Sequence, residues 1–119
     1  MEIMFVAYII VAVVLASLFT VSAAGKLRRE KKQIETLDRV GVPAKMVPLL
    51  AACEIAGAVG LLVGLAFGPI GIAAAVGTIL YFVGAIIGHL RIGDLKGIGP
   101  STFLLVLGVG ALVLRIASL

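Results

Sequence analysis

The sequence has 119 residues, of which 62% are hydrophobic and 13% are charged. Its mean hydropathy of +1.28 exceeds what a soluble domain of this length carries, so a soluble fold is excluded. The net charge of +4 would suggest nucleic acid as a partner in a soluble protein. In so apolar a chain the charge follows from membrane topology, and we expect no nucleic-acid binding.

Uncharged stretches along the chain predict four membrane spans. Apart from Glu54, there is no Lys, Arg, Asp or Glu in residues 3–25, 46–90 and 97–114. About 20 apolar residues cross the roughly 30 Å hydrocarbon core of a bilayer, and the Gly68-Pro69 turn divides the middle stretch in two. We therefore predict an all-α integral membrane four-helix bundle that forms one domain, residues 1–119, with spans at about 3–25, 44–67, 69–91 and 100–118.

The first span ends in Ser22-Ala23-Ala24, which resembles the cleavage site of a signal peptide. However, no positively charged region precedes the span, the apolar segment is longer than that of a signal peptide, and basic residues that stop transfer follow it. We therefore expect the first span to be a membrane anchor.

Residues 26–40 predict a short amphipathic helix on the inner membrane surface. Leu27, Ile34 and Leu37 are spaced by seven and three residues, which places them on one face of a helix. The Gly41-Val42-Pro43 sequence ends this helix, because Gly permits a sharp turn and Pro disfavours a helical residue before it.

The basic residues predict the orientation of the chain. Most of them lie between the first and second spans: Lys26, Arg28, Arg29, Lys31, Lys32, Arg39 and Lys45. Arg91 and Lys96 lie between the third and fourth spans, on the same side of a four-span chain. Because short loops rich in Lys and Arg stay in the cytoplasm, we predict that the N-terminus and the C-terminus lie outside. Arg115 is the exception, and we expect it to extend to the outer interface.

Glycines at a spacing of four indicate helix contact faces. Gly60, Gly64 and Gly68 lie in the second span, and Gly84 and Gly88 lie in the third. In lipid, small residues mark the faces where helices approach closely. We expect these faces to pack within one bundle, and a homo-oligomer remains an alternative.

Glu54 is the acidic residue that lies inside a span. An ionised carboxylate in hydrocarbon is costly, so Glu54 must face the bundle, find a partner or be protonated. It lies nine residues after Lys45, or roughly 13 Å along a helix, in the inner half of the bundle. Lys26, His89 and Arg91 lie in the same half and are its candidate partners.

Two interpretations of this polar cluster remain open. It is either a site for a proton, a substrate or a lipid headgroup, or a structural link in which Glu54 ties spans together through Lys26 or His89. One His and one Cys cannot form a multi-histidine metal site, a bis-histidine haem or a disulfide within one chain, so we expect no metal. Signatures of nucleophilic catalysis and phosphate binding are also absent from the sequence, which favours a protein without catalytic activity of its own.

Four motifs resemble the DoxX-like family of small bacterial membrane proteins: Ser22-Ala23-Ala24-Gly25-Lys26-Leu27, Gly41-Val42-Pro43, Glu54-Ile55-Ala56-Gly57-Ala58 and His89-Leu90-Arg91-Ile92-Gly93-Asp94. The resemblance implies a multi-pass four-helix bundle in the bacterial plasma (inner) membrane. It also implies polar positions at Lys26, Glu54, His89 and Asp94. Some members of the family are associated with quinone-linked oxidoreductases or with redox-stress complexes.

Three functions are therefore considered. The first is a small membrane subunit or accessory partner of a larger complex, with the lipid bilayer and other membrane proteins as partners and a polar site at Lys26, Glu54, His89, Arg91 and Asp94. The second is a redox-linked subunit that binds a quinone, a lipid or another amphipathic ligand beside Glu54 and His89. The third is a proton-coupled exporter of small-multidrug type, which the position of the carboxylate in the second span and the scarcity of aromatic residues in the spans disfavour.

Overall fold

The computed structural model describes residues 2–119 and contains five α-helices with one short 3₁₀ turn in that range. The elements are α1 (Glu2–Leu27), α2 (Lys31–Arg39), the 3₁₀ turn (Ala44–Met46), α3 (Val47–Val63), α4 (Gly68–Arg91) and α5 (Leu95–Ala117). The helices α1, α4 and α5 are each long and apolar enough to span a membrane. The 3₁₀ turn and α3 together form a fourth segment of this kind, Ala44–Val63. The predicted all-α four-span fold is confirmed for the described residues; Met1 of the predicted domain lies outside them.

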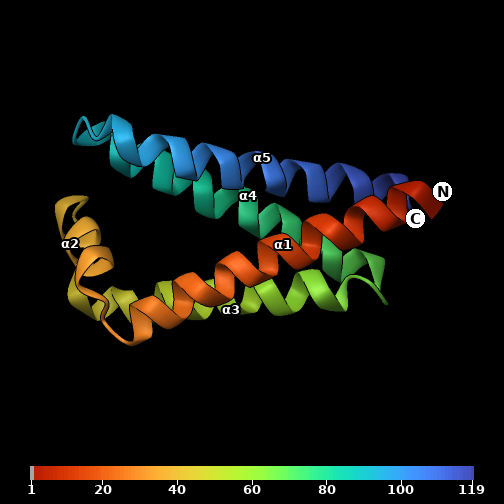
Figure 1. Ribbon diagram of the computed structural model, residues 1–119, viewed down its shortest axis with the longest axis horizontal. Coiled ribbons are helices and arrows are strands. Elements are labelled where there is room, and N and C mark those ends of the chain that lie inside the picture. Colours follow the sequence, from red (N-terminus) through yellow and green to blue (C-terminus); the bar gives the residue numbers. More distant parts are fainter. Residues whose placement is uncertain (1) are drawn as a thin grey trace.

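The four long helices form two antiparallel pairs (Figure 1). α1 packs along α3, and α4 packs along α5. The pairs approach each other at the end that carries both termini, here called the narrow end, and diverge towards the other end, here called the wide end. The short helix α2 lies across the wide end (Figure 1). The long axis measures 43 Å, which matches the thickness of a bilayer with its headgroups.

The core of the bundle lies between the two pairs near the narrow end. Tyr8, Leu15 and Leu61 are fully buried there, and the Tyr8 hydroxyl donates a 2.7 Å hydrogen bond to the carbonyl of Leu61. Large apolar side chains such as Leu80 and Val106 point outward, with about two thirds of their surface exposed. An apolar exterior of this kind suits lipid as the surrounding solvent.

The contact between α3 and α4 depends on glycine. A Cβ on Gly64 would collide with the backbone of Gly71, and a Cβ on Gly60 would lie 2.8 Å from that of Ala74. The predicted contact face of the second span is therefore confirmed at Gly60 and Gly64, which join α3 to α4 in a tight hairpin. It is wrong for Gly68, which begins α4 and faces Leu119 and Arg115. The same prediction is wrong for Gly84, which has open space where a Cβ would be, and for Gly88, near which only Val40 lies. The reason is that the helix pairs have already diverged at this level.

Three helix boundaries differ from the prediction. α1 and α2 are separate helices, as predicted, but α2 begins at Lys31 and not at residue 26, because the chain turns at Arg29, which has a positive φ of 55°. α3 ends at Val63 and not near residue 67. α5 begins at Leu95 and not near residue 100, because the side chain of Asp94 caps it by accepting a hydrogen bond from the backbone of Gly97 at 3.3 Å. Pro100 is consequently inside the helix, where it cannot donate the backbone hydrogen bond to the carbonyl of Lys96 that another residue would make.

Arg115 is buried, so the prediction that it extends to the outer interface is wrong. Its Nε donates a 2.8 Å hydrogen bond to the carbonyl of Gly64, and its Nη1 donates to Ser118 Oγ at 3.0 Å. The guanidinium carbon also lies 5.2 Å from the ring centroid of Phe5 and 5.6 Å from that of Tyr8. These contacts replace water around the cation, and they tie α5 to α1 and α3 at the narrow end.

Candidate functional site

A buried ion pair joins α1 to α3 in the wide half of the bundle. Lys26 Nζ lies 2.9 Å from Glu54 Oε1, and the two side chains are 8% and 3% exposed. The ammonium donates hydrogen bonds to Ser22 Oγ at 2.8 Å and to Gln33 Oε1 at 3.1 Å. Its contact with Glu54 does not have the geometry of a hydrogen bond, and Oε1 accepts none from the described residues. The carboxylate therefore keeps an unused capacity to accept hydrogen bonds.

Small residues bring the two helices close enough for this pair to form. Ala51 and Ala58 precede and follow Glu54 on the same face of α3 and are buried, as is Ala23 on α1. Lys26 lies in the last turn of α1, so its side chain can turn back along its own helix to Ser22. The long, flexible stem of Lys thus delivers a charge into an otherwise apolar contact.

A cavity of about 330 Å³ opens beside the ion pair, beneath α2 and between the two helix pairs. Lys26 and Glu54 line its polar part. Gln33 and Thr36 of α2 also line it, and His89 of α4 contributes to the wall. Its volume lies within the range of small-molecule binding sites, which combine an apolar wall with a few polar groups.

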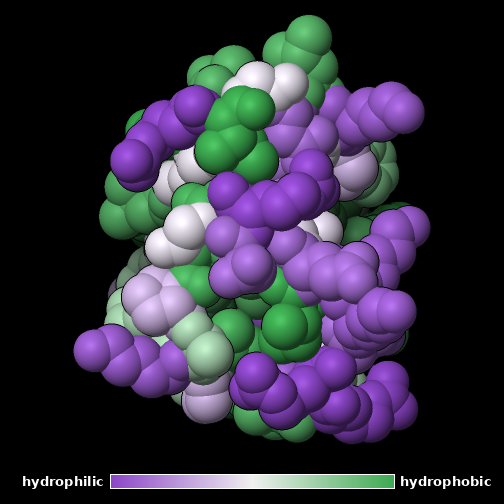
Figure 2. All heavy atoms as spheres, turned by 90° about the vertical axis from the view of Figure 1, so that its left-hand side faces the viewer, coloured by the Kyte–Doolittle hydropathy of each residue, from purple (hydrophilic) through white to green (hydrophobic). Residues whose placement is uncertain are grey.

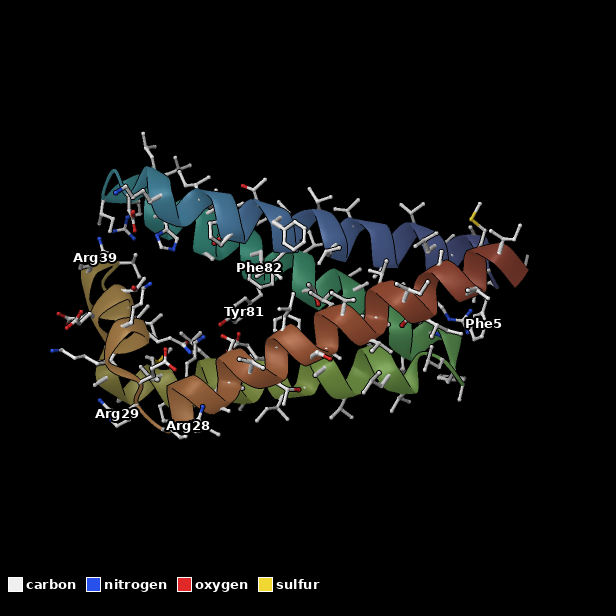
Figure 3. All side chains as sticks on the ribbon, in the orientation of Figure 1. Phe5, Arg28, Arg29, Arg39, Tyr81 and Phe82 are labelled. Atoms are coloured by element: carbon white, nitrogen blue, oxygen red, sulfur yellow. The ribbon has the colours of Figure 1, made fainter. Side chains whose placement is uncertain are left out.

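Aromatic rings form the apolar wall of the cavity. Phe19 and Phe82 stack with their centroids 5.5 Å apart, and Tyr81 meets them edge-on at 6.1 and 5.1 Å. Figure 3 shows Tyr81 and Phe82 pointing from α4 into the space between the helix pairs. These rings are not among the candidate residues that the sequence predicts. A usable signal was their spacing, because Phe19 lies seven residues before Lys26 and Phe82 lies seven before His89, which places each ring on the same helix face as a polar candidate.

His89 forms a second polar contact at the wide end. Its Nδ1 lies 3.0 Å from Asp94 Oδ2, and Arg39 Nη2 lies 3.4 Å from the same oxygen. The imidazole packs against Gly97, where any larger residue would collide with it. Asp94 therefore connects the end of α2 to the end of α4 and, through its cap on Gly97, to the start of α5.

The electrostatics of Asp94 favour its ionised form. Partial burial acts to raise the pKa of its carboxyl, but the hydrogen bonds from His89 and Gly97 and the nearby charge of Arg39 outweigh this effect and hold the pKa below its usual value of 3.8. At neutral pH the carboxylate is thus charged and able to hold α2 across the wide end.

The five candidate residues fall into separate groups. The structure pairs Lys26 with Glu54 and His89 with Asp94, and His89 lines the same cavity as the first pair. Arg91 contacts neither pair. It is exposed and lines a different cavity, of about 520 Å³, between α2 and α4. Within residues 2–119, no three His, Cys, Asp or Glu side chains lie close enough to hold a metal ion.

The surface of the wide end is strongly polar. Seen from this end, hydrophilic side chains gather over α2 and the neighbouring loops, with apolar side chains exposed between them (Figure 2). Arg28, Arg29 and Arg39 all belong to this end (Figure 3). The cavity beneath α2 is therefore close to the most basic part of the molecular surface.

We expect Asp94→Asn to loosen α2. The substitution removes the charge that attracts Arg39, so the backbone amides of α2 should exchange with solvent faster by up to about fivefold, since exposed ion pairs are weak. The measurement is hydrogen exchange by mass spectrometry in nanodiscs, corrected for the intrinsic rate at each pH. Asp38→Asn is the matched control, because Asp38 is exposed on α2 itself and forms no ion pair among the described residues.

The same contact predicts a dependence on pH. The pKa of Asp94 is lowered in the folded protein, so its contribution is complete at neutral pH and is lost as the pH falls through that lowered value. In acid, α2 of the unsubstituted protein should come to exchange as fast as α2 of Asp94→Asn. Equal protection of α2 in both proteins at neutral pH would contradict the tethering role of Asp94.

The comparisons with known proteins agree with this architecture. The sequence model of the DoxX-like family matches residues 10–111, a range that includes the Lys26–Glu54 pair, the aromatic wall and the His89–Asp94 contact. Comparisons with curated proteins and with solved structures gave no match. Since the matched range covers most of its length, this small integral membrane protein belongs to the DoxX-like family.

Proposed function

We propose that this protein is a small membrane subunit that binds an amphipathic ring compound, of which a quinone is the representative, beside Glu54 in the cavity beneath α2. One observation carries the proposal: the buried carboxylate of Glu54, whose Oε1 faces Lys26 Nζ at 2.9 Å, lines the polar end of a cavity walled by aromatic rings. A carboxylate has about four acceptor positions, so a ligand hydroxyl group can donate to one that the cation does not occupy.

The ion pair offers both kinds of hydrogen-bonding group to such a ligand. The Lys26 ammonium can donate to a carbonyl of the oxidised ring, and the Glu54 carboxylate can accept from a hydroxyl of the reduced ring. The flat rings of Phe19 and Phe82 provide an apolar surface on the same cavity. Together these groups suit a planar ligand with oxygen atoms on its rim.

The charge of the site favours a neutral ligand. Lys26 already neutralises Glu54, so a cationic substrate would have to displace the ammonium from a contact of 2.9 Å. The Phe19, Tyr81 and Phe82 rings do gather beside the carboxylate, but they pack against one another. The site therefore suits a neutral quinone better than a cation carried by an exporter.

A role as a subunit is supported by the composition of the chain. One His and one Cys do not make the ligand set of an iron–sulfur cluster or a bis-histidine haem. We propose that a membrane partner supplies electrons to the bound ring. Its recovery in stoichiometric amount after gentle solubilisation of native membranes would support this part of the proposal, and a chain that always migrates alone would count against it.

The proposed location is the bacterial plasma membrane, with the wide end on the cytoplasmic side. Basic residues that precede α3 and follow α4 all lie at the wide end, and short basic loops remain in the cytoplasm. In this orientation both termini lie outside, and the cavity opens near the inner leaflet.

The ligand proposal predicts a loss of binding in Glu54→Gln. The probe is 2,3-dimethoxy-5-methyl-1,4-benzoquinone, which has no tail, in its reduced form, added to protein in nanodiscs. The probe should raise the melting temperature of the unsubstituted protein, and its Kd should weaken by about tenfold or more in Glu54→Gln, which corresponds to about 1.4 kcal/mol.

Glu35→Gln serves as the control, because Glu35 is exposed on α2 and does not line the cavity. The shift caused by the probe is compared within each variant, so a change in basal stability cancels. A melting temperature that the probe leaves unchanged in the unsubstituted protein, or equal affinity in Glu54→Gln, would refute the proposed ligand class.

A further inference from the structure

A second hollow lies on the side of the bundle between α3 and α4. This lateral groove has a volume of about 630 Å³. Its walls consist mainly of small residues, namely Ala56, Gly57 and Gly60 of α3 and Ala73, Ala74 and Gly77 of α4. In spans otherwise rich in Leu, Val and Ile, this run of small side chains leaves a channel along the lipid-facing surface.

The groove offers hydrocarbon contacts and few hydrogen bonds. The hydroxyl of Thr78, one of its polar groups, is already used in a 2.9 Å hydrogen bond to the carbonyl of Ala74. Leu80 and Ile70, which also line the groove, are exposed on the outside of the bundle. A polar molecule would gain little here, whereas an alkyl chain would make van der Waals contacts along the groove.

The lateral groove borders the cavity beside Glu54. Phe19 and Tyr81 line both spaces, so these two rings form a wall that the cavity and the groove share. Tyr81 points into the space between the helix pairs (Figure 3) and is only partly buried. The polar cavity and the apolar groove are therefore neighbours, and a movement of these rings would join a hydrogen-bonding end to a hydrocarbon end.

We infer that the ligand of this protein carries a long apolar tail, which lies in the lateral groove while the ring lies beside Glu54. This inference rests on the proposed function and narrows the ligand class to a ring headgroup with an alkyl or prenyl chain. From Tyr81 to Ile70 the groove follows eleven residues of α4, or roughly 16 Å. A ligand of this kind reaches the site from within the membrane, between α3 and α4.

Gly77→Leu tests the position of the tail. Nothing lies within 4 Å of the place where a Cβ on Gly77 would be, so the larger side chain enters the groove without moving the backbone. Gly110→Leu is the matched control, because Gly110 on α5 also has open space around it and lines none of the three cavities. Both variants place the same side chain on a glycine of a spanning helix that has open space around its Cβ position.

The probes are the same reduced benzoquinone without a tail and its 6-decyl derivative, measured in identical nanodiscs. The decyl chain partitions into the bilayer to the same extent whichever protein variant the nanodiscs contain. This contribution therefore cancels when the ratio of the two affinities is compared between variants. In the unsubstituted protein and in Gly110→Leu, the decyl probe should bind about tenfold more tightly than the tailless probe or better. In Gly77→Leu this advantage should fall to about twofold or less, with the affinity for the tailless probe retained.

The possible failures are distinguishable. An undiminished advantage of the decyl probe in Gly77→Leu would overturn the position of the tail and leave the proposed function standing. An equal loss of both probes in a folded Gly77→Leu protein would also overturn it, because the groove would then not act on the tail. The absence of saturable binding of either probe to the unsubstituted protein would overturn both the tail and the proposed function.

Discussion

Lys26→Met should lower the free energy of unfolding by about 3–5 kcal/mol, the cost of removing one partner from a buried ion pair. The substitution keeps an apolar stem of similar length on α1 but leaves Glu54, whose side chain is 3% exposed, without its cation. Its carboxylate would then have to remain charged in a medium of low dielectric or bind a proton. Reversible unfolding in bicelles or mixed detergent micelles measures the loss.

A double variant separates the charge from the packing. Lys26→Met combined with Glu54→Leu removes both charges and should recover most of the stability, because replacing an entire buried pair by apolar residues is often neutral. A loss below about 1 kcal/mol in Lys26→Met alone would mean that the cavity beside Glu54 supplies water or a proton to the carboxylate. That result would contradict the structural link between α1 and α3.

Gly64→Leu is the second substitution with a large expected effect, and we expect it to cost about 3 kcal/mol. Even the Cβ would collide with the backbone of Gly71, and it would also come within 2.6 Å of the Tyr8 hydroxyl. Because backbone cannot rotate away as a side chain can, α3 and α4 would have to separate. The carbonyl of Gly64, which accepts the hydrogen bond from Arg115, would move with them.

The control for this effect is again Gly110→Leu, whose Cβ has open space. The free energies of unfolding of both variants are measured under the same conditions as for Lys26→Met. If Gly64→Leu and Gly110→Leu unfold alike, the close approach of α3 to α4 is not essential for the fold.

The four spans could be predicted because hydropathy and charge act over whole helices. An error at one residue does not alter a pattern of about 20 apolar positions. Helix ends depend on single contacts, which are harder to predict from the sequence. Pro100 suggested the start of the fourth span, whereas the cap formed by Asp94 starts α5 at Leu95. The predicted helix contact at Gly84 is wrong, because the helix pairs have diverged there. That divergence depends on the packing of all four helices and leaves no pattern in the sequence of one span.

The candidate site was partly predictable for a related reason. Glu54 was evident because a carboxylate in a span contrasts with everything around it. Phe19, Tyr81 and Phe82 were not evident, since aromatic side chains are common among apolar residues and only their meeting across α1 and α4 distinguishes them. The burial of Arg115 was not evident either, and the sequence predicts that it extends to the outer interface, because the phenyl ring of Phe5 and the carbonyl of Gly64 lie far from it in the sequence.

Each end of the bundle is held by an arginine, and the two arginines differ in how far they are exposed to solvent. At the narrow end, Arg115 is 7% exposed and surrounded by rings and carbonyls, whereas at the wide end the Arg39 side chain that meets Asp94 is 57% exposed. Dissolved ions screen exposed charges far more than buried ones. Raising the ionic strength therefore weakens the contact between Arg39 and Asp94 much more than the contacts of Arg115. The attachment of α2 at the wide end thus depends on the surrounding electrolyte, whereas the narrow end is nearly insensitive to it.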